Sequence, residues 1–169
     1  VIAVAGNLEH EDIVAQVRDC FWRLTGSSPV TDSREPTFNN RFVTDRIETN
    51  QAYFSVGIQA PRYDHDNRYD VHLFNTILGG GLSSRLYRSL REDQGLVYDI
   101  HSEYQAYKDA GAIIVSGSSQ PDIVFEVVDE VISIVEALAL GSNPANEEEL
   151  WQAKLYNIGQ HHIDSEDPY

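Results

Sequence analysis

The sequence predicts an α+β fold, with helices packed on one face of a mostly antiparallel sheet. Residues 52–60 alternate apolar and polar side chains, the pattern of a half-buried strand. Residues 96–107 and 112–117 form two more strand-like stretches around the turn Lys-Asp-Ala-Gly, which indicates a hairpin. Long segments with helical periodicity follow. An order of strands, helices, hairpin and helices is typical of α+β domains.

The N-terminal part reads as a strand and a helix. Residues 1–5 are apolar and end at a Gly-Asn turn, which predicts a short strand. Residues 9–24 have the periodicity of an amphipathic helix, in which Cys20 sits beside Phe21 and Trp22 and should be a buried small hydrophobe. Residues 25–40 are rich in Gly, Ser and Pro, so we expect a linker that separates residues 1–24 from residues 41–169.

After the linker, residues 41–49 are predicted to form a strand that precedes the strand at 52–60. Residues 64–78 then have helical spacing and lead into three consecutive glycines, Gly79, Gly80 and Gly81. The glycine run lacks the lysine of a phosphate-binding P-loop, and no strand precedes it. It is read from the residues as a tight turn between helices that requires positive φ.

The next helix is expected to begin at a capping serine, Ser83 or Ser84, and to bury one stripe of leucines: Leu82, Leu86 and Leu90. Arg85, Arg88 and Arg91 recur along the same helix, a row that is usually a solvated face but that could form a basic patch.

Two helices complete the chain. The first starts near residue 120, has a broad apolar stripe of valines and isoleucines, and ends at Gly141. The second starts at a capping box made by Asn146 and Glu149 and continues into His161 and His162. These adjacent histidines would point about 100° apart on a helix, so they are read as a solvated pair and not as metal ligands.

Composition excludes several classes of function. The chain has 169 residues and a formal net charge of −15, which does not suit a nucleic-acid-binding protein. No apolar run is long enough to span a membrane. One cysteine excludes an intrachain disulfide and a cysteine-rich zinc site, and no two histidines have the spacing of a helical zinc site. We therefore expect no metal to bind within this sequence.

Residues 78–98, which read LGGGLSSRLYRSLREDQGLVY, carry the most specific signal in the chain. They resemble a segment of the M16 zinc peptidases, the family of mitochondrial processing peptidase and insulin-degrading enzyme, in the compact bacterial form. In that family this segment belongs to the half that lacks zinc. Its helix supplies an arginine and its following strand supplies a tyrosine seven residues later, and Arg91 and Tyr98 have this spacing.

The resemblance implies a fold, a partner and a mechanism. M16 proteins have two similar α+β halves, of the type found in LuxS/MPP-like metallohydrolases, which close around a peptide. Residues 1–24 would be the last strand and helix of the zinc-bearing domain, and residues 41–169 a C-terminal-type domain that stops short of its end. Zinc would reside in the parent or partner domain. Arg91 and Tyr98 would orient the substrate carbonyl, and Gly79, Gly80 and Gly81 would border the substrate cavity.

The resemblance further implies a peptide substrate, assembly as a homo- or heterodimer, and a soluble protein of the bacterial cytoplasm or periplasm. Three readings of function stay open. The chain is the substrate-binding half of a zinc endopeptidase and inactive alone, a structural M16-like subunit that assembles with a zinc-bearing partner, or an unrelated binding module. The residues themselves allow a purely structural pair, in which Arg91 contacts Glu92 or Asp93 and Tyr98 packs in the sheet.

Overall fold

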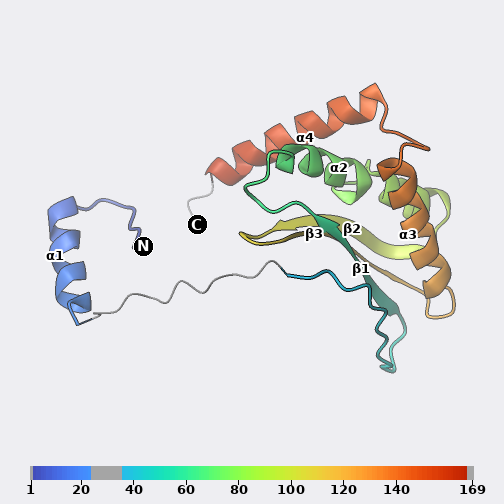
Figure 1. The fold of residues 1–169 in the computed structure, drawn as a ribbon, viewed down its shortest axis with the longest axis horizontal. Coiled ribbons are helices and arrows are strands. Elements are labelled where there is room, and N and C mark those ends of the chain that lie inside the picture. The colour runs from blue at the N-terminus through green and yellow to red at the C-terminus, as the bar shows by residue number, and fades with distance from the viewer. Residues whose placement is uncertain (1, 24–35, 167–169) are drawn as a thin grey trace. The chain divides into compact units, whose positions relative to one another are not determined.

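A computed structural model describes residues 2–23 and 36–166 (Figure 1). The chain divides into two compact units, residues 1–33 and residues 34–169. Val1 and Leu24, at the two ends of the predicted N-terminal elements, and most of the predicted linker lie outside the described residues.

The described residues of the small unit, 2–23, contain one helix, α1 (His10–Phe21), within the predicted range. The prediction of a strand at the start of this unit is wrong, because residues 2–5 have no regular structure. A strand is held by hydrogen bonds to a neighbouring strand, and the described part of this unit contains no neighbouring strand. The prediction of a buried Cys20 is also wrong: the thiol is exposed, and α1 has no buried residue. One helix with flanking coil cannot enclose a core.

The large unit is built on a three-stranded antiparallel sheet. Its strands are β1 (Ala52–Ala60), β2 (Val97–Ala106) and β3 (Gly111–Ser119), in the spatial order β1-β3-β2. The predicted strand at 52–60 and the predicted hairpin are confirmed, with β2 and β3 joined by the turn at 107–110. Residues 54, 56 and 58 of β1 pair with residues 117, 115 and 113 of β3, which places their side chains on one face.

Residues 41–49 do not form the predicted strand. Phe42, Val43 and Ile47 are 73%, 81% and 72% exposed. Their composition suits a strand, but within the described residues no other strand hydrogen-bonds to them. Phe42 instead packs its ring 5.9 Å from the ring of Phe125.

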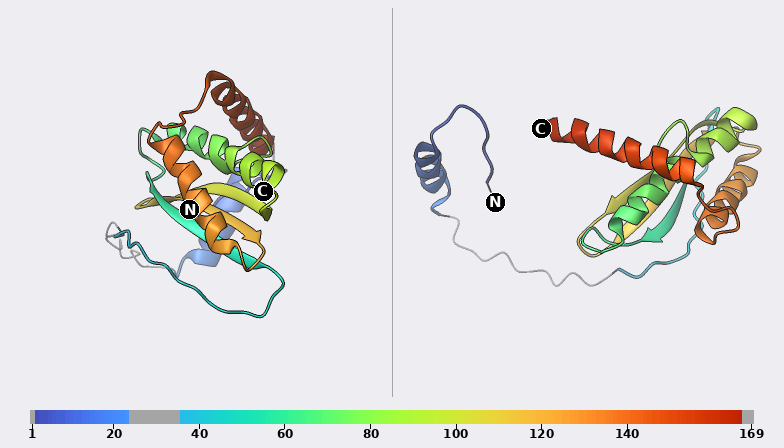
Figure 2. Two further views of the ribbon diagram at one scale, coloured as in Figure 1. Left: turned by 90° about the vertical axis from the view of Figure 1, so that its right-hand side faces the viewer. Right: turned by 90° about the horizontal axis from the view of Figure 1, so that it is seen from above.

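Helices of the large unit cover one face of the sheet (Figures 1 and 2). They are α2 (Arg68–Gly79), α3 (Val124–Ala139) and α4 (Glu147–Glu166). Helix α2 contacts β2, α3 contacts β1 and β3, and α4 lies against α2. The fully buried side chains at the centre of this layer come from α2, the next helix, β3 and α3: Leu78, Leu86, Leu90, Val115, Val127 and Val131. The α+β prediction, with helices on one face of an antiparallel sheet, is confirmed.

Local sequence signals set the end of α3 and the start of α4. Helix α3 is followed by Gly141 at φ +77°, in the left-handed region. The predicted capping box is present: the Glu149 amide donates to the Asn146 side-chain oxygen, and the Asn146 amide donates to the Glu149 carboxylate, both at 2.9 Å. Helix α2 starts four residues later than predicted, because two successive turns precede it, in which the His65 amide bonds to the Arg62 carbonyl and the Arg68 amide to the His65 carbonyl.

Candidate functional site

The helix that carries Arg91 is widened where it joins β2. It begins at residue 85, and from Tyr87 to Asp93 it is a π-helix, η1. The Gln94 amide donates to the carbonyl of Ser89, five residues back, and the Leu96 amide to the carbonyl of Leu90, six residues back. Gly95 then reverses the chain at φ +65°, a conformation that glycine adopts without steric cost. This turn sets the distance between the arginine and the tyrosine.

Two details of the predicted helix are wrong. Leu86 and Leu90 are fully buried, but Leu82 is 73% exposed because it lies in the turn before the helix starts. Ser84 does not cap the helix with its side chain: its hydroxyl is buried without a hydrogen-bond partner among the described residues. Its backbone carbonyl instead accepts from the Arg88 amide.

Arg91 reaches from η1 to the start of β2. Its Nη1 donates to the backbone carbonyl of Val97 at 3.2 Å, and its guanidinium carbon lies 6.0 Å from the ring centre of Tyr87. The structural alternative paired Arg91 with Glu92 or Asp93, but no such ion pair occurs among residues 36–166. An arginine has five N–H donors and this bond uses one, so the side chain is tethered and keeps donors for a ligand.

Tyr98 follows Val97 and lies at an irregularity in β2. Val97 is paired with Ser119 and Asp99 with Ser118, so Tyr98 is an extra residue in β2, a β-bulge. Its side chain is 47% exposed, whereas Val97 is 5% exposed. The structure therefore brings the Arg91 guanidinium to the residue that precedes Tyr98, at one end of the sheet.

The glycine run is used differently from the predicted turn, because none of Gly79, Gly80 and Gly81 has positive φ. Gly79 is buried at the end of α2, and a Cβ there would lie 2.7 Å from the backbone nitrogen of Ser102 on β2. The glycine is required because helix and strand approach closely. Ser102 lies five residues beyond Val97, roughly 16 Å along the strand. Gly79 and Arg91 thus contact different parts of β2.

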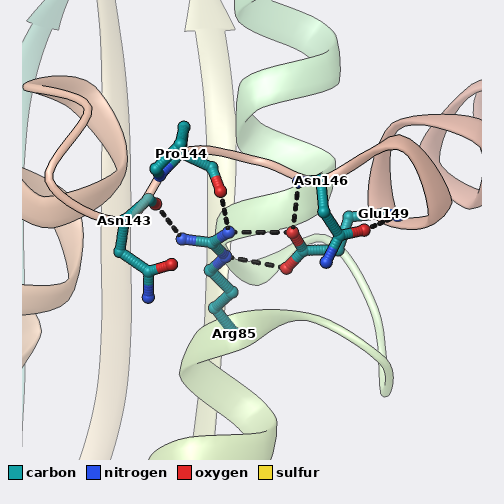
Figure 3. Close-up of polar contacts among 5 residues, drawn as sticks. All are labelled: Arg85, Asn143, Pro144, Asn146 and Glu149. Atoms are coloured by element: carbon teal, nitrogen blue, oxygen red, sulfur yellow. Dashed lines mark hydrogen bonds and ion pairs between the residues drawn. The ribbon is translucent and has the colours of Figure 1, made fainter.

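Arg85 is a structural residue and not part of a solvated face (Figure 3). Its Nε and Nη2 donate to the two carboxylate oxygens of Glu149, each at 2.8 Å, and further donors reach the carbonyls of Asn143 and Pro144. Hydrogen bonding to Arg85 lowers the pKa of Glu149 below its ordinary value. This clasp ties the helix start at residue 85 to the first turn of α4. The sequence carries no signal for it, because the partners are 64 residues apart.

The residues that could bind metal do not fit a zinc site. In the part of the chain that the structure describes, no three His, Cys, Asp or Glu side chains lie close enough to hold a metal ion. The rings of His161 and His162 are 6.5 Å apart on α4, which is exposed there. A hollow of about 610 Å³ lies at the opposite end of the sheet from Arg91, beside Phe38, Pro61 and Gly111.

Comparison with known families decides the relationship. The model of the family described as the peptidase M16 inactive domain matches residues 1–155. The chain belongs to this family. The resemblance predicted from residues 78–98 is thereby confirmed, and the match includes residues of both units of the chain.

Curated relatives are named as zinc proteases. The uncharacterized zinc protease YmxG of Bacillus subtilis is 30% identical over 139 residues, which cover 80% of this chain and 34% of that protein. An uncharacterized zinc protease of Streptomyces coelicolor is 32% identical over 148 residues, covering 80% of this chain and 32% of that protein. The M16 domain therefore spans about a third of the length of these relatives.

A solved structure supports the fold. A protease from Helicobacter pylori aligns with a TM-score of 0.73 at 17% identity, covering 96% of this chain and 40% of that one. At this identity the likeness concerns the fold alone. Among the described residues of the M16 domain, no helix has the length and apolar content that crossing a membrane requires.

Proposed function

We propose that this M16 domain is the non-catalytic, substrate-binding half of a zinc-dependent endopeptidase. Arg91 and Tyr98 orient the carbonyl of the scissile peptide bond, and a zinc-bearing M16 domain or subunit closes over them. The observation that carries the proposal is the placement of the pair. One N–H of Arg91 is tethered to the carbonyl of Val97, and the next residue, Tyr98, is a bulged tyrosine whose side chain is half exposed.

Chemistry explains why these two residue types suit the task. Attack of water on a peptide carbonyl places negative charge on its oxygen, and the zinc of the partner domain would polarise that carbonyl. Arg91 offers the remaining donors of a planar fork, and Tyr98 offers a phenolic O–H. Donors that are held in place before the reaction stabilise the developing oxyanion without the cost of reorganising. The tether from Arg91 to Val97 supplies that preorganisation.

The other parts of the proposal follow from the same arrangement. The substrate is a peptide, and the functional unit is a homo- or heterodimer, or a single chain, that includes a zinc-bearing domain. Gly79, Gly80 and Gly81 would border the substrate when the zinc-bearing domain closes, with Gly79 allowing α2 to approach β2. The zinc ligands are supplied by the partner domain, which accords with the curated relatives being named as zinc proteases and being about three times as long as the match.

Steady-state kinetics of the assembled protease tests the proposal. Arg91→Ala and Tyr98→Phe should each lower kcat/KM by about 10²–10³, the typical loss for one oxyanion donor, with unchanged zinc content. Arg88→Ala and Tyr53→Phe are matched controls, since both residues are exposed in the same domain. If Arg91→Ala and Tyr98→Phe retain the activity of these controls, the domain is a structural partner, and Arg91 and Tyr98 do not orient the substrate carbonyl.

A further inference from the structure

We propose that Gly117 on β3 is a positioning residue for Tyr98. Lacking a side chain, Gly117 leaves room for the one-residue bulge in β2 that turns Tyr98 out of the core. The catalytic meaning of this arrangement depends on the proposed function above, but the geometric claim does not.

The alternation of buried and exposed side chains along β2 is interrupted at Tyr98. Further along the strand, Ile100 and Ser102 face the helices and are 3% and 6% exposed. Side chains alternate between the faces of a strand, so a regular strand would point Tyr98 to the same buried face as Ile100. Instead Val97 is buried and Tyr98 is exposed. Without Tyr98, residues 97, 99 and 100 would alternate regularly between buried and exposed. Tyr98 is therefore an insertion, and the bulge accounts for its exposure.

Gly117 lies one residue pair beyond this irregularity, which itself faces Ser118 and Ser119. It pairs with Ile100, and a Cβ at Gly117 would come within 2.8 Å of the backbone carbonyl oxygen of Asp99. In a regular sheet the carbonyls lie in the plane of the sheet while Cβ atoms stand out of it, so the two do not collide. The Asp99 carbonyl is thus tilted toward the core face, next to the bulge. Any larger residue at position 117 would push against this backbone atom.

The second close neighbour of Gly117 is the ring of Phe54, whose Cζ would lie 2.7 Å from an added Cβ. A ring edge can rotate aside, whereas a backbone carbonyl in a paired strand cannot. The contact with Phe54 is unrelated to the bulge, so an experiment must separate it from the contact with Asp99. Gly57 provides the matched control: it lies in β1 of the same sheet, and a Cβ there would meet nothing within 4 Å.

The first experiment deletes single residues from β2. Deletion of Tyr98 restores regular alternation, so the variant should fold and its urea midpoint should stay within a few tenths of molar of the parent. Deletion of Glu103, an exposed residue of the same strand, shifts every following side chain to the other face and should abolish cooperative unfolding. If deletion of Tyr98 is as damaging as deletion of Glu103, Tyr98 is a regular strand residue and the proposal is overturned.

The second experiment combines the deletion with Gly117→Ala. In the parent, the added methyl group meets both Asp99 and Phe54; in the background without Tyr98, only the Phe54 contact should persist. Gly117→Ala should therefore lower the urea midpoint several times more in the parent than in the deletion background, whereas Gly57→Ala should have little effect in either. Equal losses from Gly117→Ala in both backgrounds would show that the bulge does not depend on Gly117.

The same variants in the assembled protease separate this inference from the proposed function. If both hold, Gly117→Ala lowers kcat/KM by roughly tenfold to a hundredfold through misplacement of Tyr98, with unchanged zinc content, and Gly57→Ala retains activity. If the midpoints show the coupling but Gly117→Ala keeps full activity, the positioning of Tyr98 stands and the catalytic role of Tyr98 is refuted.

Discussion

Replacing Arg85 by alanine should destabilise the large unit more than any other arginine substitution in its helix. The substitution removes both bonds to the Glu149 carboxylate and both bonds to the carbonyls of Asn143 and Pro144 (Figure 3). The Arg85 and Glu149 side chains are 14% and 24% exposed, so water only partly replaces the lost partner. The clasp ties the start of the helix at residue 85 to the first turn of α4, and its loss should loosen that end of α4.

The expected magnitude lies between two limits. An exposed ion pair contributes about 0–1 kcal/mol, and removal of one partner from a fully buried pair costs about 3–5 kcal/mol. A partly buried, bidentate pair with two additional carbonyl bonds should cost about 2–3 kcal/mol. With a slope of about 1.5 kcal/mol per molar urea, the midpoint should fall by roughly 1.5 M. Arg85→Lys keeps the charge but loses the fork, so most of the loss should remain.

Urea unfolding followed by circular dichroism measures this loss, with Arg88→Ala as the control, because Arg88 is exposed on the same helix. A double-mutant cycle with Glu149→Gln should give a coupling free energy of about 1 kcal/mol or more. The reasoning is refuted if Arg85→Ala shifts the midpoint no further than Arg88→Ala, or if the two substitutions in the cycle are additive.

Two more predictions concern the contacts of α2. Partial burial lowers the pKa of His72 below its ordinary value of 6.5, so unfolding takes up a proton when the pH is below that value. Stability should therefore be full above pH 6.5 and decline as the pH falls below it. His72→Gln should remove that decline in unfolding midpoints measured from about pH 7.5 to 5. Gly79→Ala should lower the free energy of unfolding, measured in urea, by about 1–3 kcal/mol, because the added Cβ collides with Ser102. Gly81→Ala should be nearly neutral, because a Cβ there would meet nothing closer than 3.8 Å. Equal effects of the two substitutions would contradict the close approach of α2 to β2.

Much of the fold could be predicted from the sequence because the decisive signals are local. Alternation along residues 52–60 matched β1 at both ends, and the Asn146–Glu149 capping box marked the start of α4. Backbone geometry and side-chain hydrogen bonds within four residues do not depend on the rest of the molecule. The M16 relationship was also contained in one local segment, residues 78–98, and the family comparison confirmed it.

Features that need a partner elsewhere in the chain were decided only by the tertiary structure. Residues 2–5 and 41–49 have the composition of strands, but pairing requires a neighbouring edge that composition does not reveal. Arg85 looked like a solvated arginine until Glu149, 64 residues away, was placed beside it.

Arg91 and Tyr98 combine both cases. The sequence shows the seven-residue spacing of Arg91 and Tyr98. The hydrogen bond from Arg91 to Val97 and the bulge that exposes Tyr98 depend on the register between β2 and β3. The sequence contains one sign of that bulge: Val97 and Ile100 are both apolar but lie three residues apart, and strict alternation in a strand would place them on opposite faces. Only the pairing of both with β3 settles which residue is extra, since register is a property of two strands and not of one.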